Sequence, residues 1–158
     1  MIKQLMVKRL TEDAILPRKD RDEDEGYDIF ASEDVVIPPK SQEKVKTGIA
    51  AWAGGISYEY PSSGTRIVYE NLYWLQIEGR SGLASKGIFP VGGIVDCGYR
   101  GEIMALLVNN STHEFVIKKG DKIAQLVIRE HIHCSVNEVE ELPESDRNEK
   151  GFGSSGTN

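Results

Sequence analysis

The chain has 158 residues, a length that favours one domain with a substantial buried core. Its net charge of −6 argues against a non-specific nucleic-acid binder, which usually presents a basic surface, but leaves room for a local basic pocket. The sequence contains no apolar run of the ~18 residues that a membrane span needs, and no secretory signal. Its two cysteines are too few for a disulfide framework. We therefore expect a cytoplasmic protein (in the host cytoplasm if virus-encoded) without membrane or nucleic-acid partners.

An all-β fold is predicted, because short β-branched and aromatic stretches are separated by glycine, proline and asparagine. The expected strands are, in chain order, residues 35–37, 43–51, 73–78, 103–108, 114–117, 123–129 and 136–140. Only residues 81–86 have the composition of a short helix. This pattern is typical of a β-sandwich or barrel.

A β-hairpin is predicted between Ile56 and Glu70. Residues 56–60 and 65–70 alternate apolar and polar, and the Pro-Ser-Ser-Gly sequence between them is a turn signal. The large side chains of this hairpin are Tyr58, Tyr60, Ile67 and Tyr69. Two interpretations are open: a hairpin that packs on its own subunit, or a docking surface for a protein partner, because aromatic residues are favoured at interfaces.

Two polar residues interrupt apolar predicted strands. Asp28 lies in the sequence EGYDIFA, and Gln125 lies in GDKIAQLV. A buried carboxylate must be paired, so we expect a partner such as an arginine for Asp28, and a structural salt bridge is as good an interpretation as catalysis. A buried amide also needs partners, so Gln125 should face either a backbone group or a polar cleft.

The sequence GRSG at residues 79–82 follows a strand and enters the predicted helix. Such a turn presents backbone N–H groups, the Ser81 hydroxyl and the Arg80 guanidinium to an anion. Serine is also favoured as a helix N-cap, so Ser81 has a capping interpretation that is compatible with phosphate binding.

The densest motif is GGIVDCGYRGE at residues 92–102. Its glycines suggest a tight hairpin whose backbone approaches something closely and could contact the edge of a planar base. Asp96 at the turn could accept a hydrogen bond from a hydroxyl or activate a water, and Tyr99 could lie against a sugar ring. Alternatively, Asp and Gly simply satisfy the geometry of a β-turn.

The sequence KGFGSSG at residues 150–156, preceded by Arg147, suits a phosphorylated, flat ligand. Arg147 can pair with a phosphate, backbone N–H groups and serine hydroxyls can face phosphate oxygens, and Phe152 can stack on a ring. A glycine- and serine-rich terminus without order is the alternative.

The order and spacing of these segments resemble the five motifs of the trimeric dUTP pyrophosphatase (dUTPase) family, over nearly the whole chain from EGYDIFA to GFGSSG. The resemblance implies a jelly-roll-like β-barrel with one short helix, assembled as a homotrimer with active sites between subunits. Residues 1–140 would form the β domain, with the aromatic hairpin as an insertion at about 54–72. Residues 141–158 would be a tail that closes over the site of a neighbouring subunit.

The resemblance also implies a role for each motif. Asp96 would be the general base, with Gln125 positioning phosphate and water and Asp28 as a supporting carboxylate. The backbone of residues 94–99 would take uracil, and Tyr99 would pack against deoxyribose. The substrate-binding residues would be Arg80, Ser81, Gly82, Gly93, Ile94, Val95, Asp96, Tyr99, Met104, Gln125, Arg147, Phe152, Gly153, Ser154 and Ser155.

The implied reaction is hydrolysis of dUTP to dUMP and pyrophosphate, by water attack on the α-phosphorus. This reaction keeps dUTP low and supplies dUMP for thymidylate synthesis. Mg²⁺ would be the cofactor, held through substrate phosphates and water rather than by a cluster of protein ligands. The sequence departs from the family at Pro90, Asn148 and Lys150, which puts the residue roles around them in doubt.

Two other functions remain open from the residues. A dCTP deaminase on the same kind of fold would need a base suited to attack at C4 of the pyrimidine, which the DCGYRGE hairpin does not suggest. A nucleotide-sensing or interaction protein could dispense with Asp96, Arg80 and the tail, all of which are intact. A zinc site at His131, His133 and Cys134 is disfavoured, because a strand would turn Cys134 away from the histidines and no fourth ligand is evident.

Overall fold

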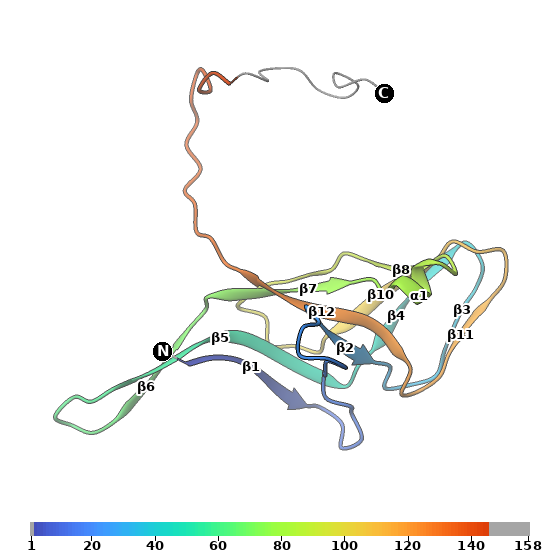
Figure 1. The fold of residues 1–158 in the computed structure, drawn as a ribbon, viewed down its shortest axis with the longest axis horizontal. Helices are drawn as coiled ribbons and strands as arrows, with labels where there is room; N and C mark the ends of the chain where they lie inside the picture. Colours follow the sequence, from blue (N-terminus) through green and yellow to red (C-terminus); the bar gives the residue numbers. More distant parts are fainter. Residues whose placement is uncertain (1, 146–158) are drawn as a thin grey trace.

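The computed structural model describes residues 2–145, and these residues form a nearly all-β domain with one short helix, which confirms the predicted fold class (Figure 1). The elements are β1 (Ile2–Arg9), β2 (Gly26–Phe30), β3 (Val35–Ile37), β4 (Ser41–Lys46), β5 (Ile49–Glu59), β6 (Arg66–Glu70), β7 (Tyr73–Glu78), α1 (Ser81–Ala84), β8 (Ile88–Val91), β9 (Ile94–Val95), β10 (Met104–Asn109), β11 (Phe115–Ile117) and β12 (Lys122–Glu130).

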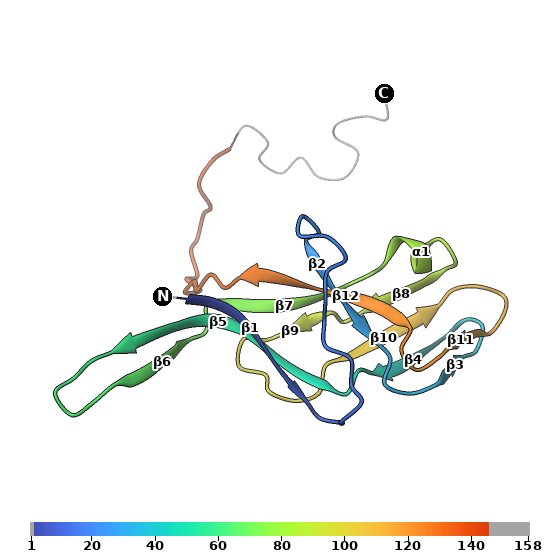
Figure 2. The ribbon, with the colours of Figure 1, turned by 60° about the horizontal axis from the view of Figure 1, so that its bottom comes forward.

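The strands pair antiparallel in four small sheets. Their orders are β2-β12-β7-β9, β4-β10-β8, β1-β5-β6 and β11-β3. The sheets surround one core in which Ile29, Val45, Ile49, Leu107 and Leu126 have no exposed surface (Figure 2). Because the order of strands in space differs from their order in sequence, β12 lies between β2 and β7 and brings three motifs together.

Strands β4 and β5 correct the prediction of one strand over residues 43–51. The chain breaks at Gly48, whose φ of +68° is the left-handed conformation that glycine adopts easily. Gly54 and Gly55, which resemble a break, instead lie inside β5, where residues 49–56 are all buried. Burial on both faces removes the alternation that identifies a half-exposed strand, so the sequence gives no clear signal here.

The predicted aromatic hairpin is present. Strand β5 pairs with β6 from Gly55↔Glu70 to Glu59↔Arg66, and the hairpin projects from the body (Figure 1). Tyr58, Tyr60, Ile67 and Tyr69 are 49%, 78%, 48% and 58% exposed. Much of this surface is therefore solvent-exposed, although the Tyr69 ring contacts Trp52 of its own subunit edge-on. The docking-surface interpretation stays a prediction.

The expected strand at residues 136–140 is absent from the described chain. After β12, residues 131–139 have no regular structure, and Val136 is 98% exposed. Figure 1 shows this segment rising away from the body. A strand needs a neighbour for its N–H and C=O groups, and no strand within residues 2–145 pairs with this segment. Conversely, β1 was not predicted, because its lysines and apolar residues do not alternate regularly.

The predicted helix is shorter than expected. Helix α1 covers Ser81–Ala84, and a turn continues it to Gly87, which has a φ of +78°. Within residues 2–145 we find no helix long and apolar enough to cross a membrane.

Candidate active site

Asp28 is a buried carboxylate, and each of its two oxygens pairs with a different cation. Its Oδ1 accepts a hydrogen bond from Arg80 Nε at 2.9 Å, and its Oδ2 lies 2.7 Å from Lys122 Nζ. The Asp28 side chain is 6% exposed, compared with 29% for Arg80 and 23% for Lys122. The predicted arginine partner is thus confirmed, and the second cation was missed. Pairing at both oxygens explains how a charge is tolerated here.

Gln125 reaches the same carboxylate, at a weaker distance of 3.4 Å from its Nε2 to Asp28 Oδ1. It pairs with Asp28 across β2 and with Glu78 across β7. Gly26 makes room beside it, since a Cβ at Gly26 would lie 2.9 Å from the Gln125 Cβ. We expected Gln125 to face either a backbone group or a polar cleft. Gln125 is half-buried, and its partner is the Asp28 side chain.

Lys122 extends this cluster to Asp20, whose Oδ2 lies 2.5 Å from Lys122 Nζ. The hydrogen bonds to Asp20 and then Asp28 raise the pKa of Lys122 above its ordinary value. The hydrogen bond from Lys122 likewise lowers the pKa of Asp20. Arg80, Asp28, Lys122 and Asp20 form what we call the Asp28 cluster, in which a carboxylate alternates with a cation.

Helix α1 begins without a serine cap. Arg80 occupies the N-cap position in extended conformation, without a side-chain cap, and Ser81 is the first helical residue. Ser81 and Gly82 are exposed. Because Arg80, and not Ser81, occupies the N-cap position, the capping interpretation of Ser81 is wrong.

A second group of predicted residues lines a pocket of about 310 Å³. The lining residues are Ile77, Gly92, Ile94, Val95, Asp96, Tyr99, Glu102, Ile103 and Met104. Five of the predicted substrate-binding residues are therefore gathered in one place: Ile94, Val95, Asp96, Tyr99 and Met104. Ile94 is 71% exposed, which leaves the β9 backbone accessible.

Gly93 is the glycine whose backbone makes the close approach predicted from the motif. A Cβ on Gly93 would lie 2.3 Å from the Ile77 carbonyl oxygen, and the Ile77 N–H donates to the Gly93 carbonyl at 2.7 Å. The expected tight hairpin is therefore modified. Strand β9 pairs with β7, and residues 96–99 form a separate turn closed by the Tyr99 N–H and the Asp96 carbonyl at 2.9 Å.

Asp96 differs from Asp28 in every respect that sets the reactivity of a carboxylate. It is exposed on the turn, and within residues 2–145 its side chain has no hydrogen-bond or ion-pair partner. An exposed carboxylate at the mouth of a pocket can accept a proton from water or a hydrogen bond from a ligand hydroxyl.

Tyr99 is held at its hydroxyl end. The hydroxyl donates to the Glu102 carbonyl at 3.0 Å, and a Cβ on Gly101 would lie 2.4 Å from the same hydroxyl oxygen. Glu102 in turn accepts a hydrogen bond from the Gly48 N–H at 2.8 Å, which ties the segment to the β4–β5 connection. The ring therefore has a defined position while 42% of Tyr99 stays exposed.

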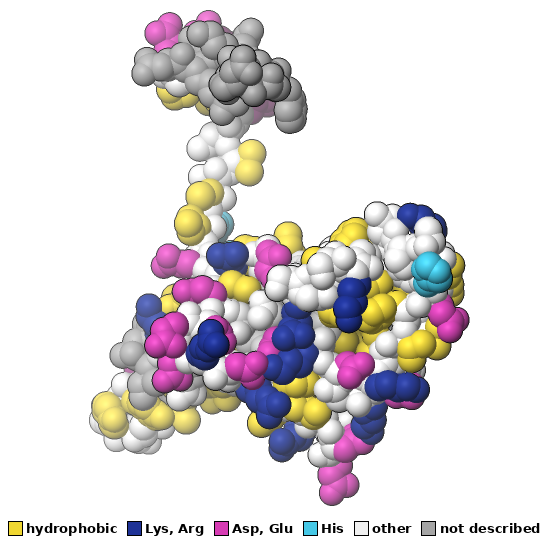
Figure 3. All heavy atoms as spheres, turned by 45° about the vertical axis from the view of Figure 1, so that its right-hand side comes forward, with side chains coloured by type: hydrophobic (Ala, Val, Ile, Leu, Met, Phe, Trp, Pro, Cys, Tyr) yellow, Lys and Arg dark blue, Asp and Glu magenta, His cyan; other side chains and the backbone are white. Residues whose placement is uncertain are grey.

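The two groups make no hydrogen bond or ion pair with each other in the described part of one chain. Arg80 and Lys122 line a separate pocket of about 350 Å³, together with Lys86 and apolar side chains of β11 and β12. Figure 3 shows Lys and Arg side chains gathered across one face with apolar atoms beside them. The predicted tail residues Arg147, Phe152, Gly153, Ser154 and Ser155 lie outside the described residues.

Among residues 2–145 there is no group of three or more His, Cys, Asp and Glu placed to hold a metal. Both Asp28 oxygens are already paired with cations. Mg²⁺ keeps several waters and commonly binds through substrate phosphates, so this donor set suits an ion that enters with a polyphosphate.

Sequence reasoning missed Lys122 and Arg100. Lys122 stands three residues before Gln125 in GDKIAQLV, and a bulge between Lys122 and Ala124 lets both reach Asp28. Arg100 donates to the carbonyls of Cys97 and Tyr99 at 2.8 Å each. Both residues stand inside motifs that the sequence analysis singled out, so their membership of a motif was a signal that they could belong to the site. Their contacts, however, are set only when the chain folds.

Comparison with known proteins identifies the family of this chain. The dUTPase family model matches residues 12–156. A deoxyuridine 5′-triphosphate nucleotidohydrolase of Clostridium kluyveri is 40% identical over 157 residues, which cover 98% of this chain and 99% of that protein. The corresponding protein of Paramecium bursaria Chlorella virus 1 is 39% identical over 153 residues, with 96% and 97% covered.

Solved structures give the same result. A Staphylococcus bacteriophage 80alpha dUTPase bound to dUpNHpp superposes with a TM-score of 0.79 at 30% identity, covering 97% of this chain and 98% of that one. A mutant dUTPase from phage phi11 of S. aureus, described as coordinating a structural Mg(II) ion, has a TM-score of 0.72 at 27% identity over 89% and 99% of the two chains. This chain belongs to the dUTPase family.

Proposed function

We propose that this protein hydrolyses dUTP to dUMP and pyrophosphate. The observation that carries the proposal is the exposed Asp96 carboxylate, which has no side-chain partner among residues 2–145 and lies on the wall of a pocket formed by β9, Tyr99 and Met104. Membership of the dUTPase family supports the same substrate. The reaction would keep dUTP low and supply dUMP in the cytoplasm.

In this proposal the pocket selects a deoxyuridine. The backbone of β9 hydrogen-bonds to the edge of uracil, and cytosine leaves these groups unpaired. The ring of Tyr99, fixed through Glu102, lies against deoxyribose and excludes a 2′-hydroxyl. Asp96 contacts the 3′-hydroxyl and takes a proton from the attacking water. The water oxygen bonds to the α-phosphorus, and the bond from that phosphorus to the bridging oxygen breaks, releasing pyrophosphate.

Phosphates would be bound by the first turn of α1 with Arg80, while Gln125 positions phosphate and water. Asp28 holds the Arg80 guanidinium in place through Oδ1, while Lys122 pairs with Oδ2, so Asp28 acts through Arg80. When bound, Mg²⁺ neutralises charge on the three phosphates and fixes them for in-line displacement. The chain would hold this ion indirectly, through the groups that bind the phosphates.

We also propose that the protein is a homotrimer. The Asp28 cluster and the Asp96 pocket share no hydrogen bond or ion pair in the described part of one chain, which is compatible with a site assembled from one subunit's phosphate-binding groups and another subunit's pocket. The exposed apolar residues of the segment after β12, among them Ile132, Val136 and Leu142, favour contact with another copy. Residues 141–158 would form the tail that closes a neighbouring site.

The aromatic hairpin would serve a protein partner in addition. Four large side chains exposed on one projecting element are the composition expected of an interface.

The test is pyrophosphate release from dUTP, dTTP, dCTP and UTP with Mg²⁺, in wild type and Asp96→Asn. The expected result is turnover of dUTP alone, lost on chelation of Mg²⁺ and in the variant. Asp34→Asn is the matched control, since Asp34 is an exposed carboxylate paired with Lys118. Release of ammonia from dCTP would move the assignment to a deaminase. Nucleotide binding without turnover would refute the catalytic proposal.

A further inference from the structure

Arg100 contacts both the Asp96–Tyr99 turn and the foot of the aromatic hairpin. Its Nη1 donates to the Cys97 and Tyr99 carbonyl oxygens, each at 2.8 Å. Its Nη2 lies 3.5 Å from Asn71 Oδ1, at the limit of a hydrogen bond. Its Cζ lies 5.5 Å from the centre of the Trp52 ring. One guanidinium therefore joins the segment that carries Asp96 to the strands that carry the hairpin.

The partners of Arg100 on the hairpin side are themselves fixed. We call Trp52, Tyr69 and Asn71 the hairpin base. Trp52 Nε1 donates to Asn71 Oδ1 at 2.8 Å, and the Tyr69 ring meets the Trp52 ring edge-on, at 5.9 Å and 75°. A Cβ on Gly54 would lie 2.1 Å from the Trp52 ring, so the glycine makes room for it.

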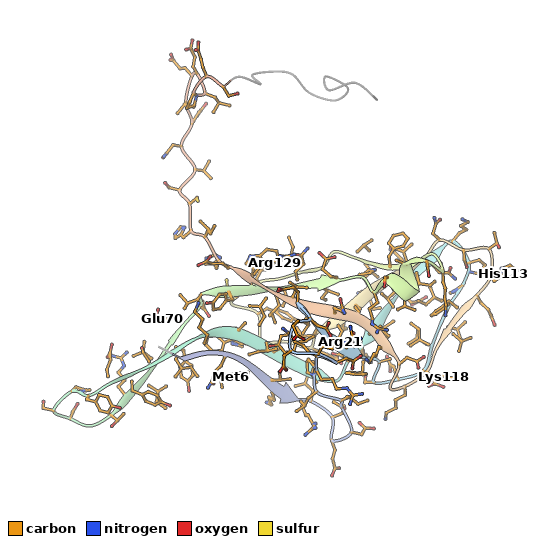
Figure 4. The ribbon with its side chains drawn as sticks, viewed as in Figure 1. Met6, Arg21, Glu70, His113, Lys118 and Arg129 are labelled. Carbon is orange, nitrogen blue, oxygen red and sulfur yellow. The ribbon has the colours of Figure 1, made fainter. Side chains whose placement is uncertain are left out.

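Arg100 lies beside an open pocket, so its position depends on the contacts described above. Trp52, Tyr69 and Arg100 line a pocket of about 560 Å³, with Met6 and Lys8 on its β1 side. Figure 4 places the labelled Met6 and Glu70 in this region, where the hairpin leaves the body. Arg100 itself is exposed, so core packing does not fix it, and its planar fork is directed by the carbonyls, the ring and Asn71.

We propose that Arg100 is a positioning residue through which the aromatic hairpin controls the substrate turn. The two carbonyls that Arg100 binds belong to residues on either side of Gly98, so its loss relaxes the turn that places Asp96 and Tyr99. A displacement of the hairpin base moves Arg100 and changes dUTP affinity and the discrimination between deoxyribose and ribose. This inference rests on the proposed function of the Asp96 pocket.

Steady-state kinetics with dUTP and UTP test the proposal in Arg100→Lys and Asn71→Ala. Lysine keeps the charge but cannot donate to both carbonyls while lying flat on the ring. We expect kcat/KM for dUTP to fall about tenfold to a hundredfold in Arg100→Lys, mainly through KM, because small misplacements have large effects. In Asn71→Ala, kcat/KM for dUTP should fall about threefold to tenfold, the effect expected from the loss of one hydrogen bond. In both, the dUTP/UTP preference should narrow.

The matched control is Glu59→Gln, which removes the exposed Glu59–Arg66 ion pair on the same hairpin without touching the hairpin base. It should retain wild-type kinetics and substrate preference. Global destabilisation would lower turnover of dUTP and UTP alike, whereas a displaced Tyr99 changes their ratio.

A second readout does not depend on turnover. In a Trp74→Phe background Trp52 is the single tryptophan, since the chain has two. Binding of dUMP should change its fluorescence because Arg100 lies over its ring, and the change should disappear with Arg100→Lys. Unchanged dUTP/UTP preference in both variants, in an enzyme that hydrolyses dUTP, would overturn this inference alone. An inactive wild type would overturn the proposed function instead.

Discussion

Asp28 and Asp96 belong to the same proposed site, but their different surroundings favour different roles. Asp28 is 5% exposed and lies between Arg80 and Lys122, so both oxygens are occupied. Asp96 is exposed on a turn without a side-chain partner in residues 2–145. A carboxylate held between two cations orders its neighbours, whereas one without such partners is free to accept a proton from water. Environment, rather than residue type, assigns the two roles.

The comparison predicts its largest effect for Asp96→Asn. Removing the base should lower turnover of dUTP by about 10²–10⁴-fold. Because the side chain is exposed, the free energy of unfolding should stay within about 0.5 kcal/mol of wild type. Pyrophosphate release and urea unfolding measure the two quantities on the same preparations. Full turnover in the variant would show that Asp96 is not the base.

Asp28→Asn should, in contrast to Asp96→Asn, lower the free energy of unfolding. Neutralising Asp28 leaves Arg80 without its counter-charge and Lys122 with Asp20 alone, and breaking a buried pair typically costs ~3–5 kcal/mol. Both cations keep some solvent contact, so we expect a loss of about 3 kcal/mol, at the lower end of that range. Urea unfolding measures it, with Asp34→Asn as the exposed-carboxylate control. An unfolding free energy equal to wild type would contradict the structural role.

The pocket wall and the turn each contain a glycine, and substitution by alanine should affect the two positions differently. Gly93→Ala places a Cβ against the Ile77 carbonyl, so β9 must shift from β7, with an expected loss of about 1–3 kcal/mol. Gly98→Ala is the matched change, because no atom lies within 4 Å of its Cβ position among the described residues. Its unfolding free energy should change by less than about 0.5 kcal/mol. Equal losses in the two variants would mean that the close approach at Gly93 does not limit the strand.

The smallest effect concerns the outer end of the Asp28 cluster. Lys122 lowers the pKa of Asp20, so the stability from this pair is present above the unfolded value of about 3.9 and is lost as pH falls through the lower folded value. The raised pKa of Lys122 adds a second limit, since its contribution is lost only at strongly alkaline pH. Asp20→Asn should therefore be slightly less stable than wild type near neutral pH.

Urea midpoints measured across the acid range test this pH dependence. The difference between wild type and Asp20→Asn should shrink below about pH 4, where Asp20 becomes protonated first in the unfolded and then in the folded wild type. A difference that stays constant to lower pH would show that the Asp20 charge does not contribute.

The sequence identified the chemistry of the site better than its contacts. An aspartate in an apolar strand predicted an arginine partner, and Arg80 fulfils it across 52 positions of chain. The same argument could not find Lys122, because Lys122 follows a turn and resembles an ordinary exposed lysine. Its contact with Asp20 joins residues 102 positions apart, a separation for which local pattern contains no information.

Local pattern by itself determined the all-β class, the aromatic hairpin, the short helix and the order of motifs that marks the family. Each depends on residues close in sequence, through alternation, turn chemistry and glycine spacing. The tertiary structure decided which glycine breaks a strand, since Gly48 takes a φ of +68° between β4 and β5 whereas Gly54 stays inside β5. It also decided that Asp28 is paired and Asp96 is exposed. Pairing and burial are set by strands that meet only after folding, which is why they had to be observed.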